Sequence, residues 1–204
     1  MSCNTHCRSQ RSEDGPMPTR RTLLGQAALG AFVQACTFDA LAQDTPPAPP
    51  AEVLAAMPGT RLVGNGRLRY FGLSVYDAAL WALPGFEPAQ FSQQRFALCL
   101  TYLRAFTASD IAQRSLQEIR RMHEVAPDTA RTWLTNLQDI LPDVAAGDRI
   151  TGLHPPGGVS FWHQGRRIGG MGDAAFGTKF FGIWLGEATS EPKLRNALLA
   201  RAAT

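Results

Sequence analysis

Cysteine is scarce in this sequence, and neither charge of one sign nor any known catalytic motif stands out. Only four of the 204 residues are cysteines, and three of them fall within the first 42 residues, which leaves Cys99 alone in the rest of the chain. A single cysteine excludes an internal disulfide there, and its apolar neighbours favour an inert buried thiol. The net charge of +3 is too small to indicate a nucleic-acid partner. The sequence also lacks a G-x-S-x-G motif, a phosphate-binding loop and a Cys-His nucleophile arrangement.

The N-terminal segment predicts export. Arg20-Arg21 precedes the apolar run from Leu23 to Ala35, and Ala40-Leu41-Ala42 follows as a cleavage site of the A-x-A type. The apolar run is too short to span a bilayer. We therefore predict that residues 1–42 are an N-terminal extension and export signal of the twin-arginine type, cut after Ala42. The mature protein is then periplasmic or secreted, with no stable transmembrane helix.

Two features of this segment leave alternatives open. Met17 stands directly before a compact basic region, so it is an alternative start to the first methionine. Val33-Gln34-Ala35-Cys36 resembles a bacterial lipobox, although Gln34 is polar where that motif prefers a small or aliphatic residue. A lipid anchor at Cys36 is therefore the alternative to a soluble mature form.

The remainder of the chain divides into a tether and one domain. Residues 43–58 begin with a proline-rich run, which predicts an extended spacer. Residues 59–204 are long enough to bury one core and are expected to form a single domain.

Alternating side chains predict strands. In the stretch from Arg67 to Leu83, Tyr76 and Leu80 share one face of an extended chain and Trp81 lies on the other. This stretch is expected to break near Gly72, and a short strand before it is expected to end at a turn over Gly64–Gly66. The other expected strands are Arg95 to Arg104, Gly147 to Leu153, and the hairpin of Val159 to His163 with Arg167 to Gly170.

Four segments predict helices, which begin near Thr107, Pro127, Asp173 and Ser190. The first opens with a capping-box pattern and carries an apolar stripe, so that Arg114 and Glu118 are expected to face solvent. Strands, two helices, a hairpin and two more helices follow one another along the chain. This order predicts an α+β fold, an antiparallel sheet with helices packed on one face.

Three segments resemble a known family. They are G-N-G-R-L-R…F-G-L-S-V-Y-D-A-A-L-W (64–81), P-D-V-A-A-G-D-R-I (142–150) and F-W-H-Q-G-R-R-I-G-G-M-G-D…F-F-G-I-W-L-G…T-S-E-P-K-L-R-N-A-L-L (161–199). The chain is similar in these segments to the chalcone isomerase-like proteins of bacteria. The resemblance implies the open-faced β-sandwich of that superfamily, a curved antiparallel sheet backed by helices.

The resemblance also implies a catalytic set, which this sequence largely lacks. The enzymes of the superfamily cyclise a chalcone to a flavanone with an arginine, a hydroxyl residue, a tyrosine and a polar residue. The arginine would be Arg69 or Arg67, whereas the hydroxyl position falls on Phe71 and the polar position close to Ile183. No tyrosine occurs between Phe106 and His123. Stabilising an enolate needs more than an arginine, so the catalytic residues stay unassigned.

Other members of the superfamily bind fatty acids, with an arginine and a tyrosine that hold the carboxylate. Tyr102 and Arg104 end an apolar strand face, and Arg69 and Tyr70 form a second such pair. These four residues are the predicted ligand-binding residues, although the alternative for Arg104 is that it only leaves the sheet into solvent. The first hypothesis is a non-catalytic binder of a small amphipathic or aromatic molecule, such as a fatty acid.

Two other functions stay open. One is an isomerase or intramolecular lyase with an altered site, and the other is a protein-interaction domain whose cleft is closed by core side chains. His154 and His163 are too few for a metal site and are expected at the surface or in turn contacts. No metal and no cofactor is predicted.

Overall fold

The structure, a computed structural model, describes residues 47–202. The predicted export signal, its cleavage site at Ala42, the alternative start at Met17 and the alternative lipid anchor at Cys36 lie outside the described residues. They stay predictions, and so does the location outside the cytoplasm that follows from them.

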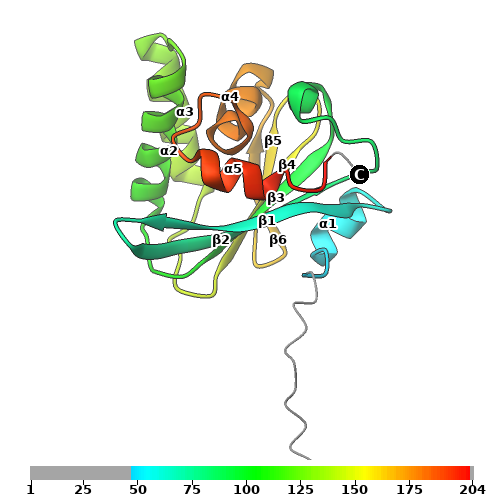
Figure 1. Ribbon diagram of the computed structural model, residues 1–204. Coiled ribbons are helices and arrows are strands. Elements are labelled where there is room, and N and C mark those ends of the chain that lie inside the picture. The colour runs from blue at the N-terminus through cyan, green and yellow to red at the C-terminus, as the bar shows by residue number, and fades with distance from the viewer. Residues whose placement is uncertain (1–46, 203–204) are drawn as a thin grey trace, which may run out of the picture. The chain divides into compact units, whose positions relative to one another are not determined.

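Within the described residues, six strands form one antiparallel sheet in which each strand pairs with its neighbours in sequence order (Figure 1). The β1–β2 and β5–β6 turns consist of Phe71-Gly72 and Gln164-Gly165, and all four residues have positive φ. Such two-residue turns match the twist of the paired strands. The strands are β1 (Arg61–Tyr70), β2 (Leu73–Ala82), β3 (Phe96–Tyr102), β4 (Arg149–His154), β5 (Val159–His163) and β6 (Arg166–Met171).

The glycines of β1 do not form the predicted turn. Gly64, Asn65 and Gly66 are paired with Leu80, Ala79 and Ala78 in the middle of the strand. The helix α5 (Pro192–Leu198) crosses β1 so closely that a Cβ on Gly64 would lie 2.2 Å from the carbonyl oxygen of Ala197. The turn prediction is wrong here because these glycines permit close packing of a helix on a strand.

The other large helices pack where the sequence predicts them. Helices α2 (Ala108–Met122), α3 (Pro127–Ile140) and α4 (Ala174–Leu185) lie over one face of the sheet (Figure 1). Thr107 and Asp110 form the capping box of α2, and the Asp173 carboxylate caps α4. The main core lies between sheet and helices, and its largest fully buried side chains include Phe96, Phe161, Phe176 and Phe181. The predicted α+β class is thereby confirmed.

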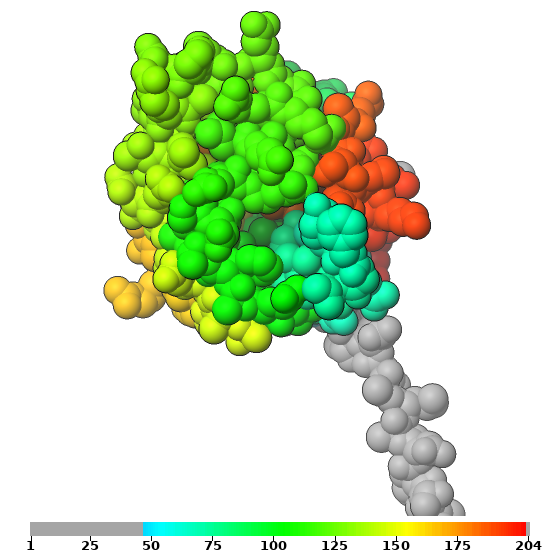
Figure 2. Space-filling view, turned by 90° about the vertical axis from the view of Figure 1, so that its left-hand side faces the viewer, coloured from blue at the N-terminus to red at the C-terminus, as the bar shows by residue number. Residues whose placement is uncertain are grey.

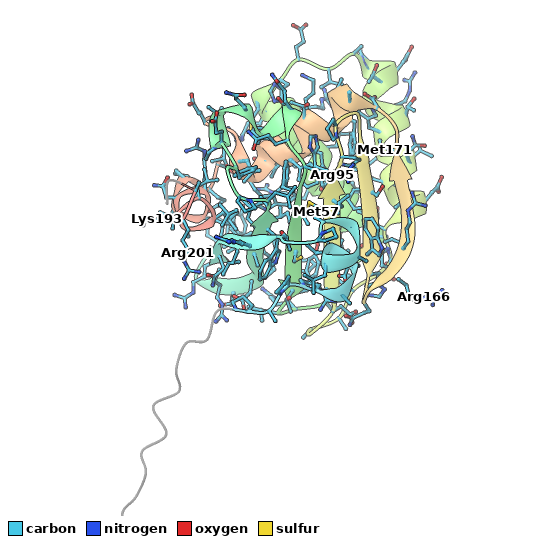
Figure 3. The ribbon with its side chains drawn as sticks, turned by 90° about the vertical axis from the view of Figure 1, so that its right-hand side faces the viewer. Met57, Arg95, Arg166, Met171, Lys193 and Arg201 are labelled. Atoms are coloured by element: carbon cyan, nitrogen blue, oxygen red, sulfur yellow. The ribbon has the colours of Figure 1, made fainter. Side chains whose placement is uncertain are left out.

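Two short helices are absent from the sequence prediction. One is a 3-10 helix, η1 (Pro88–Gln93), between β2 and β3, and the other is α1 (Ala51–Ala56). Although the sequence places α1 in the tether, Val53 on this helix and Met57 just after it are fully buried in a second, smaller cluster on the opposite face of the sheet. Figure 3 shows Met57 directed towards the strands. Helix α1 is short and directly follows the proline-rich run, so the sequence pattern did not predict it.

Polar groups join this second cluster. The buried Glu52 carboxylate pairs with Arg149 at 3.2 Å and accepts a hydrogen bond of 2.8 Å from Thr151. Burial raises the pKa of the neighbouring Cys99 thiol to about 11, and the Glu52 carboxylate acts in the same direction. Cys99 is buried and protonated at neutral pH, as an inert thiol should be.

His154 and His163 differ from each other in burial. His154 is buried, stacks on Phe96 at 4.9 Å between ring centroids, and faces the Gln94 carbonyl through Nδ1 at 2.9 Å. Burial lowers its pKa, so the ring is neutral in the core. A surface position was therefore the wrong expectation for His154, because strand register pairs it with Phe96. His163 lies in a turn contact, 3.6 Å from the Asp148 carboxylate.

Candidate ligand-binding site

A cavity of about 570 Å³ lies between the helix-covered face of the sheet and helices α2 and α4. Figure 2 shows its opening as a hollow beside the β1–β2 turn and the segment that follows β3. The volume is in the range of small-molecule sites. The inner wall is apolar and consists of Leu68, Leu100, Ile111, Leu141, Ile150, Phe161, Phe180 and Ile183.

Two tyrosines from neighbouring strands are among the polar residues that line the cavity. Tyr76 on β2 is paired directly with Tyr102 on β3, so both side chains face the helices, with ring centroids 5.9 Å apart. The indole Nε1 of Trp184 donates a hydrogen bond of 2.9 Å to the Tyr76 hydroxyl. The Tyr102 side chain is only 4% exposed, and its hydroxyl has no hydrogen-bond partner within residues 47–202. This hydroxyl is therefore available to donate a hydrogen bond to a polar group that enters the cavity.

Both phenols are protonated donors at neutral pH. Burial raises the pKa of Tyr76 and of Tyr102 far above the usual tyrosine value, and for Tyr102 the nearby Tyr76 adds to the rise. The Tyr76 oxygen already accepts from Trp184, which leaves its own proton free to be donated. The cavity therefore offers two O–H donors against an apolar wall, an arrangement that suits an oxygen acceptor on an otherwise apolar molecule.

Arg104 is the unpaired cation at the cavity mouth. It is exposed, lines the cavity and has no ion pair or hydrogen bond to the rest of the described chain. Arg114 also lines the cavity, but it pairs with Glu118 at 2.8 Å and lies over the Tyr70 ring at 5.6 Å. The carboxylates of Asp110 and Glu191 line the same cavity, so a favourable environment for an anion is expected only close to Arg104.

The position of Glu118 on α2 differs from the prediction. It was predicted to face solvent, but it is only 6% exposed. The chain after α4 covers it: Ser190 donates a hydrogen bond of 3.0 Å to its carboxylate, and Arg114 and Arg121 pair with it at 2.8 and 2.9 Å. Helical periodicity reveals the stripe that faces the sheet but not the burial caused by a distant loop, which is why this prediction is wrong.

Three of the four predicted ligand-binding residues line the cavity. Tyr70, Tyr102 and Arg104 do so, whereas Arg69 is exposed and lies outside the lining, next to a register shift between Leu68 and Arg69. Arg67, the other arginine that the family pattern allowed, is held by Asp77 through two hydrogen bonds of 2.6 and 2.8 Å. Whether any of these residues contacts a ligand stays a prediction.

Two positions of the catalytic set that the resemblance implies hold apolar side chains, Phe71 and Ile183. Phe71 lies in the exposed β1–β2 turn at the mouth, and Ile183 gives the cavity an apolar side chain. Tyr76 and Trp184 are the functional candidates that the sequence missed. The only signal for Tyr76 was its place on the same strand face as Leu80, because strand register cannot be read from one sequence. Within the described residues, no group of three or more His, Cys, Asp or Glu side chains could hold a metal ion.

The fold and the cavity together define an α+β protein whose antiparallel sheet and helices enclose an amphipathic pocket. The sequence matches the chalcone isomerase-like family over residues 55–200, and the chain belongs to that family. No curated protein matches the sequence. Among solved structures, a fatty-acid binding protein of Arabidopsis thaliana is similar, with a TM-score of 0.57 and 15% identity, covering 72% of this chain and 90% of that chain. The predicted fold is therefore confirmed, and at this identity the likeness concerns the fold alone.

Residues 47–202 contain no helix whose length and apolar content would suffice to cross a bilayer.

Proposed function

We propose that this protein binds a small amphipathic acid, such as a medium-chain fatty acid, and does not transform it. The observation that carries the proposal is the unpartnered Tyr102 hydroxyl inside an apolar cavity of about 570 Å³. The acyl chain would lie against Leu100, Ile150 and Phe180, where burial of its apolar surface drives binding. Fatty-acid binding by the similar Arabidopsis thaliana protein supports this choice of ligand class.

The carboxylate of such a ligand would lie near the mouth. Arg104 offers a charge-assisted hydrogen bond there, and Tyr102 offers a neutral one from within the cavity. The Asp110 and Glu191 carboxylates also line the cavity and would repel the ligand's carboxylate, so this group is expected beside Arg104. The paired Arg114 would contribute less, because Glu118 already occupies its guanidinium.

Catalysis is the second candidate, and the two protonated phenols are the observation in its favour. Tyr76 and Tyr102 could both donate to a developing oxyanion, as hydrogen-bond donors do in enzymes. The exposed Phe71 and the apolar Ile183 weigh against a chalcone isomerase-type intramolecular lyase, because they stand where the enzymes have polar groups. The interaction domain with a closed cleft is disfavoured, since its core side chains would have to fill the space that the cavity occupies.

We also propose that the protein is a bacterial member of its family that acts in the periplasm or outside the cell. The motif at Arg20-Arg21 and the cleavage site ending at Ala42 support this address. Lipidation of Cys36 would keep the mature domain at a membrane surface and remains the alternative.

Native mass spectrometry of the purified protein tests the binding proposal first, since a tightly held amphiphile survives gentle purification. We expect an adduct with the mass of a fatty acid, together with calorimetric binding of decanoate to protein from which that lipid has been removed. A protein that carries no ligand and binds neither decanoate nor a chalcone would contradict the proposal. Turnover of a chalcone would instead favour the enzyme.

A further inference from the structure

The tip of the β1–β2 hairpin gathers apolar side chains in solvent. Tyr70, Phe71 and Leu73 are three of the five large hydrophobic residues that are exposed in the part of the chain that the structure describes, and Phe71 is 88% exposed. The other two, Leu54 and Leu83, lie in α1 and just after β2. Single exposed apolar residues are ordinary, whereas a contiguous group marks an interaction surface.

The fold holds these side chains outwards at a conformational cost. Phe71 has φ of 47°, which is rare for a bulky residue, and its two-residue turn normally selects asparagine followed by glycine. The Tyr70 and Phe71 rings pack edge to face at 4.5 Å, and the Arg114 guanidinium lies 5.6 Å from the Tyr70 ring centre. Backbone strain of this kind persists where the surroundings enforce it and is concentrated at functional sites.

The hairpin tip is continuous with the cavity. Tyr70, Phe71 and Leu73 all line the cavity, and Arg104 lines it from the segment after β3 (Figure 2). A ligand with a long apolar chain is poorly soluble and partitions into bilayers. A cavity that receives such a ligand gains from an opening that can rest on the membrane surface, where amphipathic aromatic rings are also favoured.

Cations flank the tip. Arg69 precedes Tyr70 and Arg104 lies at the mouth, and neither has a carboxylate partner among residues 47–202. The Asp110 and Glu191 carboxylates line the same opening and are the opposing charges, whereas the Glu118 carboxylate is already paired with Arg114 and Arg121. Two free arginines beside exposed apolar side chains complement the anionic headgroups of a lipid surface.

We propose that the β1–β2 hairpin tip docks the protein on an anionic lipid bilayer. Phe71 and Leu73 insert among the acyl chains, Arg69 and Arg104 contact headgroups, and the cavity mouth faces the membrane from which the ligand enters. This inference rests on the proposed function and adds the source of the ligand. A protein partner is the competing occupant of the same tip.

A tryptophan introduced at the tip reports insertion directly. Two variants of the full chain are compared: Phe71→Trp, and Leu83→Trp as a matched control at another exposed position. Each is mixed with vesicles of phosphatidylcholine and phosphatidylglycerol at roughly three to one. The phosphatidylcholine carries brominated acyl chains. We expect the bromines to quench the added fluorescence of Phe71→Trp and not that of Leu83→Trp. Because both variants share residues 1–46, binding through that segment cannot produce the difference. Equal quenching of the two would overturn the proposal.

Vesicle co-sedimentation measures how much the apolar and the cationic side chains of the hairpin tip each contribute to membrane affinity. We expect Phe71→Ser with Leu73→Ser to lower partitioning onto these vesicles about tenfold, whereas Leu54→Ser with Leu83→Ser should leave it within about twofold. Arg69→Gln should weaken binding to the anionic vesicles about fivefold and leave binding to pure phosphatidylcholine unchanged. Equal partitioning of the two serine variants would contradict docking and leave the tip to a protein partner.

These assays separate the two proposals. No fatty acid is present with the vesicles, and no vesicle is present when decanoate is titrated into the protein. A cavity that binds decanoate on a protein whose tip ignores vesicles would overturn docking alone, and the reverse result would overturn the fatty-acid proposal alone.

Discussion

The rings of Tyr76 and Tyr102 lie edge to face with their centroids 5.9 Å apart. Of their two hydroxyl groups, only that of Tyr76 has a hydrogen-bond partner within residues 47–202, the indole of Trp184. The two phenols are paired across neighbouring strands and both line the cavity. Tyr76 therefore links the sheet to α4, while the hydroxyl of Tyr102 is free to form a hydrogen bond with a ligand in the cavity.

Removing each hydroxyl separates these roles. Tyr102→Phe should weaken decanoate binding about fivefold, the value of about 1 kcal/mol for a neutral hydrogen bond, and should hardly change the free energy of unfolding. Tyr76→Phe should lower the free energy of unfolding by about 1–3 kcal/mol, because the buried Trp184 N–H loses its acceptor. Calorimetry and urea denaturation of both variants check this. Stability losses of the same size would show that Tyr102 has a partner after all.

Alkaline pH provides a second test of the buried phenols. Burial raises the pKa of Tyr102 in the folded state, so above about pH 10 the unfolded chain loses a proton that the folded chain keeps. The contribution of Tyr102 to the free energy of unfolding should be constant below that pH and fall as the pH rises further. Tyr76 and Cys99 act in the same direction, so the comparison is between wild type and Tyr102→Phe, whose decline should be shallower. Identical slopes would contradict the burial of an unpartnered phenol.

Much of the fold could be predicted because patterns among neighbouring residues determine where many helices and strands form. The capping box at Thr107, the cap at Asp173 and the alternation of β3 each depend on neighbouring residues, and each is present. What failed depends on contacts between distant segments. The glycines of β1 accommodate α5, and Glu118 is buried by the chain around Ser190.

The candidate site could be predicted only in part, for the same reason. Tyr102 and Arg104 follow from one strand's periodicity and the family resemblance, and both line the cavity. The pairing of Tyr76 with Tyr102 is a matter of strand register, and the indole of Trp184 arrives from a helix far along the chain. Arg69 looked equivalent to Arg104 in the sequence, but a register shift at the end of β1 places it outside the cavity lining.

We expect no chalcone isomerase activity from this protein. With Phe71 exposed in a turn and Ile183 apolar, too few polar groups remain to position a chalcone and stabilise its enolate. The rate of chalcone cyclisation, followed by absorbance, should stay close to background. An acceleration of about 10⁶ or more, which is ordinary for enzymes, would contradict the non-catalytic proposal.

Export can be tested apart from the folded domain. Residues 17–45 fused to a folded reporter should carry it across the bacterial inner membrane, and Arg20→Lys with Arg21→Lys should block this transport. N-terminal sequencing of the mature protein should find residue 43 first. Unchanged export of the lysine variant would exclude the twin-arginine route, and a lipidated Cys36 would replace the soluble form.

Calorimetric titration of decanoate into Arg104→Ala and Arg69→Ala shows whether the carboxylate of a fatty acid binds at the cavity mouth. The two arginines are both exposed and both lack a carboxylate partner in the described residues, but only Arg104 lines the cavity. A charge-assisted hydrogen bond to the carboxylate at this solvent-accessible mouth is worth about a tenfold change in affinity. We expect that loss for Arg104→Ala and a nearly unchanged affinity for Arg69→Ala. Equal affinities in the two variants, or no binding to the unmutated protein, would contradict it.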